Sequence, residues 1–383
     1  MTFSTLALVV ALGLLGPVLA LRTSWHVPVI LGELVAGIVF GATGFGVLNS
    51  DDAIFAFLAD IGFAVVMFVA GTHVPVRDPA VRSALGAGAV RAVLVGVLAA
   101  AAGWGIARWF DTGHGAIYAV LMASSSAALV LPIIDSLGLQ GKPVLALTAQ
   151  VAVADTACIV ALPLVIDPAN AGRAAIGAVA VAACAVALFL VLRRLEQSGM
   201  RRRAHRVSED RSFALELRVS LALLFALCAV ATQTHVSIML AGFAAGLAVA
   251  GIGEPRRVAR QLFAINDGFL GPLFFVWLGA RLNLREFGEH PHLILLGLTL
   301  GMGAVLVHLL PRLLGQPITH GTLAAAQIGV PVAAVTVGSQ LNVLIPGEGS
   351  ALMLGALCTI AAAAMAASRI AAHTTADTHP KAN

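Results

Sequence analysis

Long apolar stretches recur along the whole chain, and the short segments between them carry most of the charge. Each stretch approaches the roughly 20 residues that a helix needs to cross a bilayer. Lipid satisfies no backbone N–H or C=O group, so stretches of this kind must be helices. The pattern predicts about 13 transmembrane helices, over residues 3–21, 27–46, 53–74, 88–110, 115–137, 144–166, 173–192, 213–232, 236–252, 263–282, 293–314, 319–343 and 350–371.

The composition narrows the class of protein further. Hydrophobic residues form 59% of the 383-residue chain and charged residues 11%, against roughly 25% charged in soluble domains. One soluble core could not hide this much apolar surface, which excludes a cytosolic enzyme, a secreted disulfide scaffold and a disordered protein. The net charge of +4 does not indicate a nucleic-acid partner, because the basic residues lie between apolar stretches. We predict an all-α polytopic membrane protein.

The distribution of Lys and Arg predicts the orientation, because cytoplasmic loops are enriched in both. With the N-terminus outside, eighteen of the 23 Lys and Arg residues fall on the cytoplasmic side. The exceptions are Arg218 within a span and Arg108, Arg173, Arg281 and Arg285 outside. We therefore expect the N-terminus outside and the C-terminus in the cytoplasm, in the cell (inner) membrane.

The longest charged segment divides the chain into two halves. We expect a single membrane domain over residues 1–383. Its parts are a first half over 1–192, a basic cytoplasmic linker over 193–212, a second half over 213–371 and a short polar cytoplasmic tail over 372–383.

The halves resemble each other at a constant offset of seven spans. The matched positions are Gly37 and Gly41 with Gly242 and Gly246, Gly71 with Gly279, and Pro132 with Pro331. Since seven is odd, the second copy would be inverted relative to the first. An inverted repeat with a proline-interrupted span in each half is typical of secondary transporters that bind their cargo at mid-membrane.

Asp155 lies in the middle of the sixth span, about 16 Å from either end at helical rise. A carboxylate at this depth costs roughly 2.5–3.5 kcal/mol on insertion scales, so it should face a cavity or a partner. One carboxylate can hold a proton or a metal cation but not readily both, and this competition is sufficient for exchange. The alternative is a structural aspartate that is protonated or paired.

The fifth span contains Ser124, Ser125 and Ser126, followed by Pro132. Proline frees the carbonyl four residues before it, so a helix break here would expose carbonyl and hydroxyl oxygens that suit Na⁺. The alternative is a kinked helix whose serines bond to their own backbone. The twelfth span offers the matching residues Gly329, Pro331 and Gly338.

Other polar residues within the spans are weaker candidates, for which structural roles are favoured. Five of them could support the site: Glu33, Asp60, Gln150, Thr156 and Arg281. His308 is expected to be a packed histidine. The chain has no Walker A motif, dinucleotide-binding glycine loop, HExxH motif or nucleophile elbow, so we expect no enzymatic activity, no cofactor and no ATP-driven transport within it.

Four segments resemble, in order, helices of the monovalent cation/proton antiporter superfamily, in its Kef-type and NapA-like branch. They are PVILGELVAGIVFG at 28–41, LADIGFAVVMFVAG at 58–71, SIMLAGFAAG at 237–246 and PLFFVWLG at 272–279. The resemblance runs from about residue 5 to residue 370. It implies a core (transport) domain, a dimerisation domain, a homodimer and two crossing, partly unwound helices, here the fifth and twelfth spans.

The resemblance also places the family's ion-binding aspartate at Asp155. This chain departs from the family at the preceding residue, where Ala154 replaces a polar side chain. A family lysine would fall near Gly303, and an acid that usually follows Gly71 is replaced near His73. With one carboxylate and no basic partner, we expect one cation to exchange for one proton, with no net charge moved.

Three functional hypotheses follow. The first is a transporter that exchanges Na⁺ or K⁺ for H⁺ by alternating access, with Asp155 as the binding group and the three serines as co-ligands. The second, motivated by Ala154, is a proton-coupled transporter of another solute with Asp155 as a pure proton carrier. The third, motivated also by Gly303, is a non-transporting membrane sensor or assembly protein. The expected partners are the transported ions, the lipid bilayer and a second copy of the chain.

Overall fold

The computed structural model describes residues 1–21, 29–74, 76–198, 215–234, 236–253 and 256–378, and no β-strand occurs in these ranges. Ten helical stretches are long and apolar enough to cross a membrane. Three shorter apolar helices bring the number to the predicted one: Val29–Phe40, Leu217–Gln233 and Ile238–Ala250. The prediction of an all-α polytopic fold is confirmed.

The helices follow the predicted order. Those of the first half are α1 (Phe3–Gly13), α2 (Leu15–Ala20), α3 (Val29–Phe40), α4 (Ala53–Thr72), α5 (Pro79–Phe110), α6 (Gly115–Ala123), α7 (Ala127–Ser136), α8 (Lys142–Ile166) and α9 (Ala171–Gln197). Those of the second half are α11 (Leu215–Gln233), α12 (Ile238–Ala250), α13 (Arg256–Ile265), α14 (Gly271–Arg281), α15 (Glu286–Glu289), α16 (His292–Leu309), α17 (Ile318–Ala324), α18 (Gly329–Gln340) and α19 (Glu348–Thr378).

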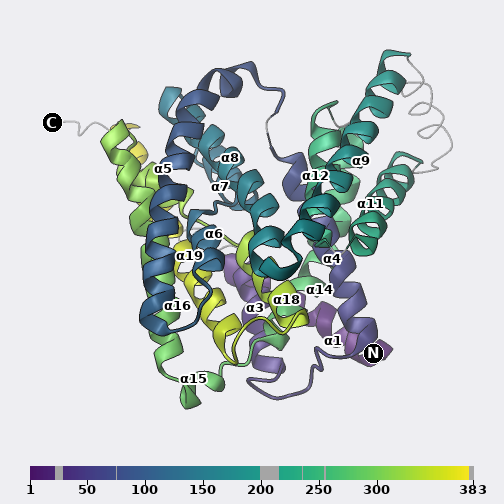
Figure 1. Cartoon of the computed structure of the whole chain (residues 1–383). Coiled ribbons are helices and arrows are strands. Elements are labelled where there is room, and N and C mark those ends of the chain that lie inside the picture. The colour runs from purple at the N-terminus through teal and green to yellow at the C-terminus, as the bar shows by residue number, and fades with distance from the viewer. Residues whose placement is uncertain (22–28, 75, 199–214, 235, 254–255, 379–383) are drawn as a thin grey trace.

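These helices form two bundles that lie side by side (Figure 1). Helices α5 to α8 pack with α16 to α19, and we call this group the crossing bundle. Helices α1 to α4 pack with α11 to α14, and we call this group the second bundle. Helix α9 packs against α8, α11 and α12, so it joins the two bundles along their common boundary.

The packing follows the predicted repeat. Helix α3 packs on α14 as α12 packs on α4, and α5 packs on α8 as α16 packs on α19. The matched glycines make the first two contacts close: a Cβ on Gly37 would lie 2.2 Å from the carbonyl oxygen of Val276, and one on Gly246 would lie 2.1 Å from that of Phe68. Small residues at these positions let the backbones touch, as is usual between membrane helices.

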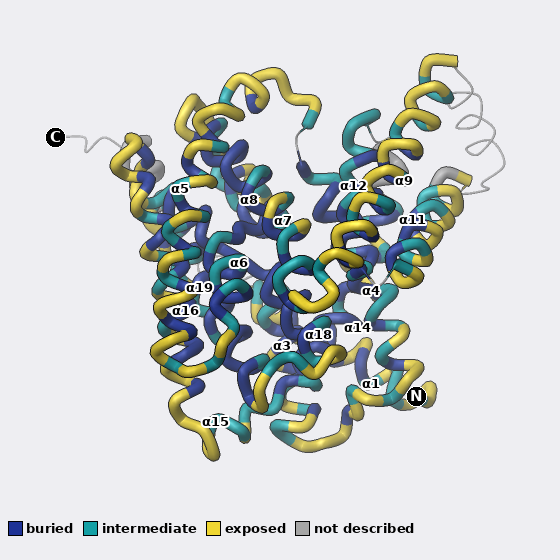
Figure 2. The backbone as a smooth tube through the Cα atoms, viewed as in Figure 1, coloured by how far each residue is buried: buried dark blue, intermediate teal, exposed yellow. Residues whose placement is uncertain are grey.

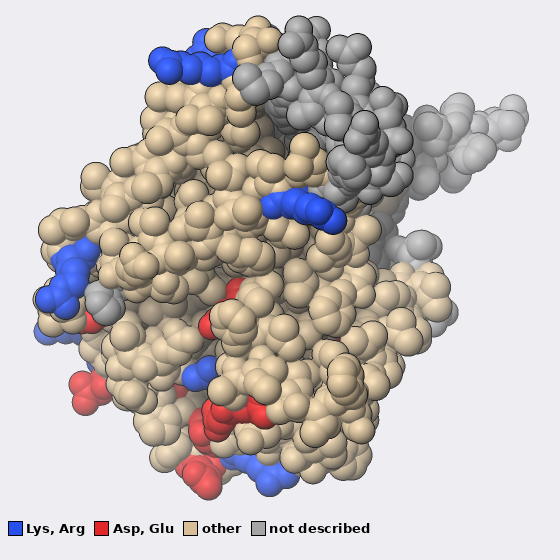
Figure 3. Space-filling model, turned by 90° about the vertical axis from the view of Figure 1, so that its right-hand side faces the viewer, with Lys and Arg blue, Asp and Glu red and all other residues tan. Residues whose placement is uncertain are grey.

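Burial separates central from peripheral helices. The most apolar window of Ile318–Gln340 is 83% buried, whereas that of Pro79–Phe110 is 22% buried, and Figure 2 shows the exposed residues on the outer helices. The exposed residues of α5 include Val93, Val97 and Trp104. Figure 3 shows few charged side chains over a broad face of the molecule. A bilayer would cover such apolar surfaces.

Several helix ends differ from the predicted spans. Helix α5 starts at Pro79 rather than at 88, because the Asp78 carboxylate accepts a hydrogen bond from the N–H of Ala80 (2.8 Å) and proline suits the first helical position. Helix α9 continues to Gln197, so it includes the start of the predicted linker, and residues 199–214 lie outside the described ranges. Helix α19 continues to Thr378, so most of the predicted tail is helical.

Candidate functional site

The fifth and twelfth spans are both interrupted, as predicted. Helix α6 ends at Ala123 and α7 begins at Ala127, whereas α17 ends at Ala324 and α18 begins at Gly329. The two breaks are bonded directly to each other. The N–H of Ser126 donates to the carbonyl of Ala326 (2.8 Å), and the Ser125 hydroxyl donates to the carbonyl of Ala324 (2.6 Å). Backbone groups that lose their helical partners are therefore satisfied by the opposite chain segment.

The first break lies at the serines and not at Pro132. Pro132 is inside α7, where it removes one backbone hydrogen bond without ending the helix. In the twelfth span Gly329 is the first residue of α18, and Pro331 lies in its first turn, where a missing N–H costs nothing. Gly338 lies within α18, and a Cβ there would be 2.7 Å from Leu344 Cγ. The prolines are thus near the crossing, but the serine segment forms it.

Asp155 lies in α8 and is only 4% exposed. Its Oδ2 accepts a hydrogen bond of 2.9 Å from the N–H of Ala127, the first residue of α7. The partial positive charge of a helix N-terminus favours an anion at this position. Across the described residues, Asp155 has no second hydrogen bond, and no three His, Cys, Asp or Glu side chains cluster as metal ligands. The carboxylate thus keeps most of its acceptor capacity unused.

The three predicted serines are all buried, but their hydroxyls differ. The Ser124 hydroxyl lies 2.7 Å from Gln327 Oε1 and 2.8 Å from the carbonyl of Leu121. Together with the bond from Ser125, this contact fastens one break to the other. Ser126 is the N-cap of α7 without a side-chain capping bond, and its hydroxyl has no partner among the described residues. Ser126 precedes the N–H that holds Asp155, so it is the serine best placed to share a ligand with it.

Two further polar residues lie at the crossing: His308, which was expected to be a packed histidine, and Gln327, which was not among the predicted site residues. The fully buried His308 lies with Nδ1 2.8 Å from the carbonyl of Ala304 and Nε2 3.4 Å from the Ser125 hydroxyl. The side-chain oxygen of Gln327 accepts a hydrogen bond from the Ser124 hydroxyl. A glutamine in the middle of an apolar span was the sequence signal that could have identified Gln327 as a site residue. At the position where the family lysine would fall, a Cβ on Gly303 would lie 2.9 Å from the sulfur of Met122.

The supporting residues predicted on α8 lie close to Asp155 in sequence but do not bond to it. The Thr156 hydroxyl donates to the carbonyl of Ala152 (2.8 Å) within its own helix. Gln150 is 1% exposed, and neither amide atom has a hydrogen-bond partner in the described part of the chain. Gln150 is therefore a buried polar group without an assigned role.

The other three supporting residues belong to the second bundle. Glu33 lies on α3 and interacts electrostatically with Asp267. Asp60, on α4, interacts with Arg281, whose guanidinium carbon lies 5.3 Å above the centre of the Trp277 ring. The structure thus places Glu33, Asp60 and Arg281 in their own packing environments and not beside Asp155.

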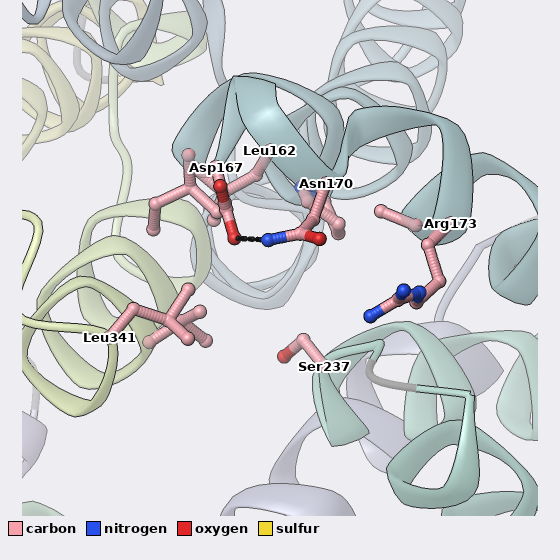
Figure 4. Close-up of a pocket in the computed structure, with 10 residues that line it drawn as sticks. Leu162, Asp167, Asn170, Arg173, Ser237 and Leu341 are labelled. Carbon is pink, nitrogen blue, oxygen red and sulfur yellow. Dashed lines mark hydrogen bonds between the residues drawn. The ribbon is translucent and has the colours of Figure 1, made fainter.

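A cavity of about 150 Å³ opens at the boundary of the bundles, where the end of α8 meets the starts of α9 and α12 (Figure 4). Asn170 donates to Asp167 (2.8 Å) on one side of it, while Arg173 and Ser237 face each other across it. On α8 this cavity begins at Leu162, about 10 Å along the helix from Asp155. Its lining residues include neither Asp155 nor any residue of the two breaks.

Comparisons with known proteins agree on one family. Residues 6–377 match the sodium/hydrogen exchanger transmembrane family. The chain is 29% identical over 269 residues to the Na⁺/H⁺ antiporter NhaS5 of Synechocystis sp., covering 68% of this chain and 37% of that protein. It is 27% identical over 352 residues to the glutathione-regulated potassium-efflux system protein KefC of Salmonella typhi, covering 87% of this chain and 55% of that protein. The chain thus spans about half or less of both relatives.

A solved structure has the same fold. It is that of the sodium proton antiporter MjNhaP1 from Methanocaldococcus jannaschii, with a TM-score of 0.68 and 18% sequence identity, and the match covers 97% of both chains. At this identity the likeness establishes the arrangement of the helices. The transported solute has to be inferred from the chemistry of the site.

Proposed function

The chain belongs to the sodium/hydrogen exchanger family, and we propose that it is a secondary active transporter that exchanges Na⁺ or K⁺ for H⁺ across the membrane. The names of its relatives, an Na⁺/H⁺ antiporter and a potassium-efflux protein, support both cations. The observation that carries the proposal is the environment of Asp155: a buried carboxylate at the helix crossing with a single hydrogen bond.

In the proposed mechanism Asp155 binds a cation and a proton in competition. Without a cation, burial favours the neutral acid, because an isolated charge in apolar surroundings is costly. An arriving cation displaces the proton and binds the carboxylate, with the Ser126 hydroxyl and carbonyl oxygens of the breaks as co-ligands. The N-terminus of α7, which donates from Ala127, holds the ionised carboxylate in place.

One carboxylate sets the stoichiometry in this proposal. Each cation that binds releases one proton, so one positive charge moves in each direction and no net charge crosses the membrane. Ala154, beside Asp155, supplies no second carboxylate. Exchange would accordingly be electroneutral.

Alternating access would come from movement of the crossing bundle relative to the second bundle. The crossing bundle carries Asp155 and both breaks, while α9 links it to the second bundle. Where the bundles meet near the crossing, a Cβ on Gly329 would lie 3.5 Å from Met67 Cε, so a glycine there leaves room for sliding. We propose that the second bundle forms the homodimer, with the N-terminus outside and the C-terminus in the cytoplasm of the cell membrane.

Liposomes that contain the purified chain and an internal pH dye test the exchange. Separate pulses of Na⁺, K⁺ and Li⁺ should alkalinise the lumen when the cation enters it, because protons leave in exchange, and acidify it when the cation leaves. The Asp155→Asn variant, which keeps the shape of the side chain but neither titrates nor attracts a cation strongly, should give no response. An applied membrane potential should leave the rate unchanged.

The alternatives make different predictions in the same liposomes. A response to protons and an organic solute, without any response to the cations, would favour proton-coupled transport of another solute. No response to either from folded protein would favour a sensor or assembly protein and would end the exchange proposal.

A further inference from the structure

A large apolar groove runs along the boundary of the bundles, and it shares no lining residue with the cavity in Figure 4. Its volume is about 590 Å³, and helices α8, α9 and α12 form its walls. Three exposed or half-buried valines from α8 and α9 line it: Val160 (39% exposed), Val179 (69%) and Val186 (57%). Apart from two arginines at one end, the only polar side chain among its lining residues is that of Thr156. The Thr156 hydroxyl donates to a carbonyl within α8. Such walls suit a hydrocarbon chain better than water or an ion.

One end of the groove is strongly basic. The groove shares Arg77, Arg82, Phe189 and Gly251 with an adjoining cavity of about 530 Å³, so the two are continuous. That cavity adds Arg193 and the single carboxylate of Glu196. We call this end the basic mouth. Three guanidinium groups against one carboxylate give it a net charge of about +2.

Two of the arginines are held at the mouth by the backbone. Arg77 donates to the carbonyl of Ile252, and Arg82 Nε donates to the carbonyl of Val76 (3.0 Å). A guanidinium has five N–H donors, so a bond to one carbonyl leaves others for an anion. Planar arginine donors match phosphate oxygens in geometry as well as in charge.

The dimensions of the groove match one leaflet of a bilayer. It follows α9 from Ala178 to Phe189 and α12 from Leu240 to Gly251, about 16 Å along each helix. Half of a hydrocarbon core that is roughly 30 Å thick is about 15 Å. A lipid whose headgroup lies at the basic mouth would therefore place an acyl chain along the whole groove.

We propose that this groove binds one anionic phospholipid, with its phosphate at Arg77, Arg82 and Arg193 and an acyl chain between α8, α9 and α12. The lipid contacts both bundles and the helix that joins them, so its binding favours the arrangement of the bundles seen here. The proposal does not depend on which cation the protein carries.

Native mass spectrometry of the full chain tests the proposal, after equilibration in micelles with equal amounts of phosphatidylglycerol and phosphatidylcholine. The wild type should retain one phosphatidylglycerol preferentially. The double variant Arg82→Gln/Arg193→Gln should lose this preference by at least about tenfold, since each basic residue near a lipid headgroup contributes on the order of 1 kcal/mol. Arg82→Lys, which keeps the charge, should retain most of the binding.

A second variant tests the acyl chain. Val186→Trp should fill the groove and release the lipid while the mouth stays intact. The matched controls are Arg108→Gln at the other end of α5 and Val97→Trp on the exposed face of α5, and both should bind like the wild type. Size-exclusion profiles and melting temperatures identify variants that fail to fold. Equal retention by all variants, equal loss in the controls, or full retention by Val186→Trp would overturn the proposal.

Discussion

Two buried carboxylates in the crossing bundle have opposite environments. Glu348, at the start of α19, is fully buried and accepts hydrogen bonds from the Tyr118 hydroxyl (2.6 Å), the Ile345 N–H (2.9 Å) and His114 Nδ1 (2.7 Å). Asp155, 4% exposed, accepts one bond from the N–H of Ala127. The first carboxylate is surrounded by donors, whereas the second is left largely unpaired at the helix crossing.

We interpret this difference as the distinction between a structural acid and the proposed transport site. A carboxylate offers about four acceptor positions, and the donors around Glu348 occupy most of them, so neither a proton nor a cation gains by binding there. Asp155 keeps acceptor positions for a ligand that can leave again. Burial is common to both carboxylates, so the proposal that Asp155 is the exchange site rests on its small number of protein donors.

The largest predicted effect is on Asp155. Asp155→Asn should reduce cation-driven proton exchange to the level of empty liposomes, because the group that holds the ion is lost. The variant should fold and melt at or above the wild-type temperature, since replacing a poorly paired buried acid with an amide removes a desolvation cost. Exchange in liposomes and thermal unfolding in detergent measure the two effects. If Asp155→Asn instead failed to fold, Asp155 would be a structural acid like Glu348.

Substitution of Glu348 should have the opposite pattern of effects, with stability reduced and exchange retained. Glu348→Gln should lower the free energy of unfolding by about 3 kcal/mol, because the amide cannot accept from all three donors and leaves buried polar atoms unpaired. The exchange rate per folded molecule should stay near the wild-type value. Denaturant unfolding and exchange corrected for the folded fraction test this. Loss of exchange in stable Glu348→Gln protein would contradict the contrast.

Sequence reasoning found the features that are local in the chain. The apolar stretches, the intramembrane charge at Asp155 and the serine segment are each visible within a single span, and the family resemblance is confirmed by the match over residues 6–377. The predicted position of the first helix break was less accurate. Pro132 suggested it, but the helix is interrupted at the serines because the opposite break supplies their hydrogen-bond partners.

The missed features join residues that are far apart in sequence. The contacts from Ser124 to Gln327, Ser125 to His308 and Tyr118 to Glu348 each link the first half to the second. A polar residue near a predicted span end, such as Glu348 before the span at 350–371, is ordinary by itself. Its role becomes visible only when the fold brings His114 and Tyr118 to it.

A smaller effect should appear in the pH dependence of stability. The hydrogen bond from His114, which lies just outside its span, to Glu348 raises the pKa of His114 above its ordinary value of 6.5, against an opposing effect of burial. A raised pKa in the folded state means that the ion pair stabilises the fold fully below about pH 6.5, and that this contribution disappears as the pH rises through the folded-state pKa. The wild type should therefore exceed His114→Gln in stability by roughly 1 kcal/mol at pH 5.5, with the gap closing at alkaline pH.

Melting temperatures of both proteins from pH 5 to pH 9 provide the measurement. His290→Gln, at an exposed histidine, is the matched control and should follow the wild type throughout. A gap between the wild type and His114→Gln that widens with pH would show that the pair with Glu348 does not hold the proton.

The smallest predicted effect distinguishes the serines around Asp155. Ser126→Ala should raise the KM for the cation about threefold and leave kcat nearly unchanged, because one neutral hydroxyl ligand contributes about 1 kcal/mol or less. Ser124→Ala should instead lower the melting temperature, since its hydroxyl contacts Gln327 and the carbonyl of Leu121. Initial rates over a series of cation concentrations, with unfolding of the same samples, separate the two. If Ser124→Ala raised the KM and Ser126→Ala did not, the cation would lie on the Gln327 side of the crossing, and the unpaired oxygen of Asp155 would not be its main ligand.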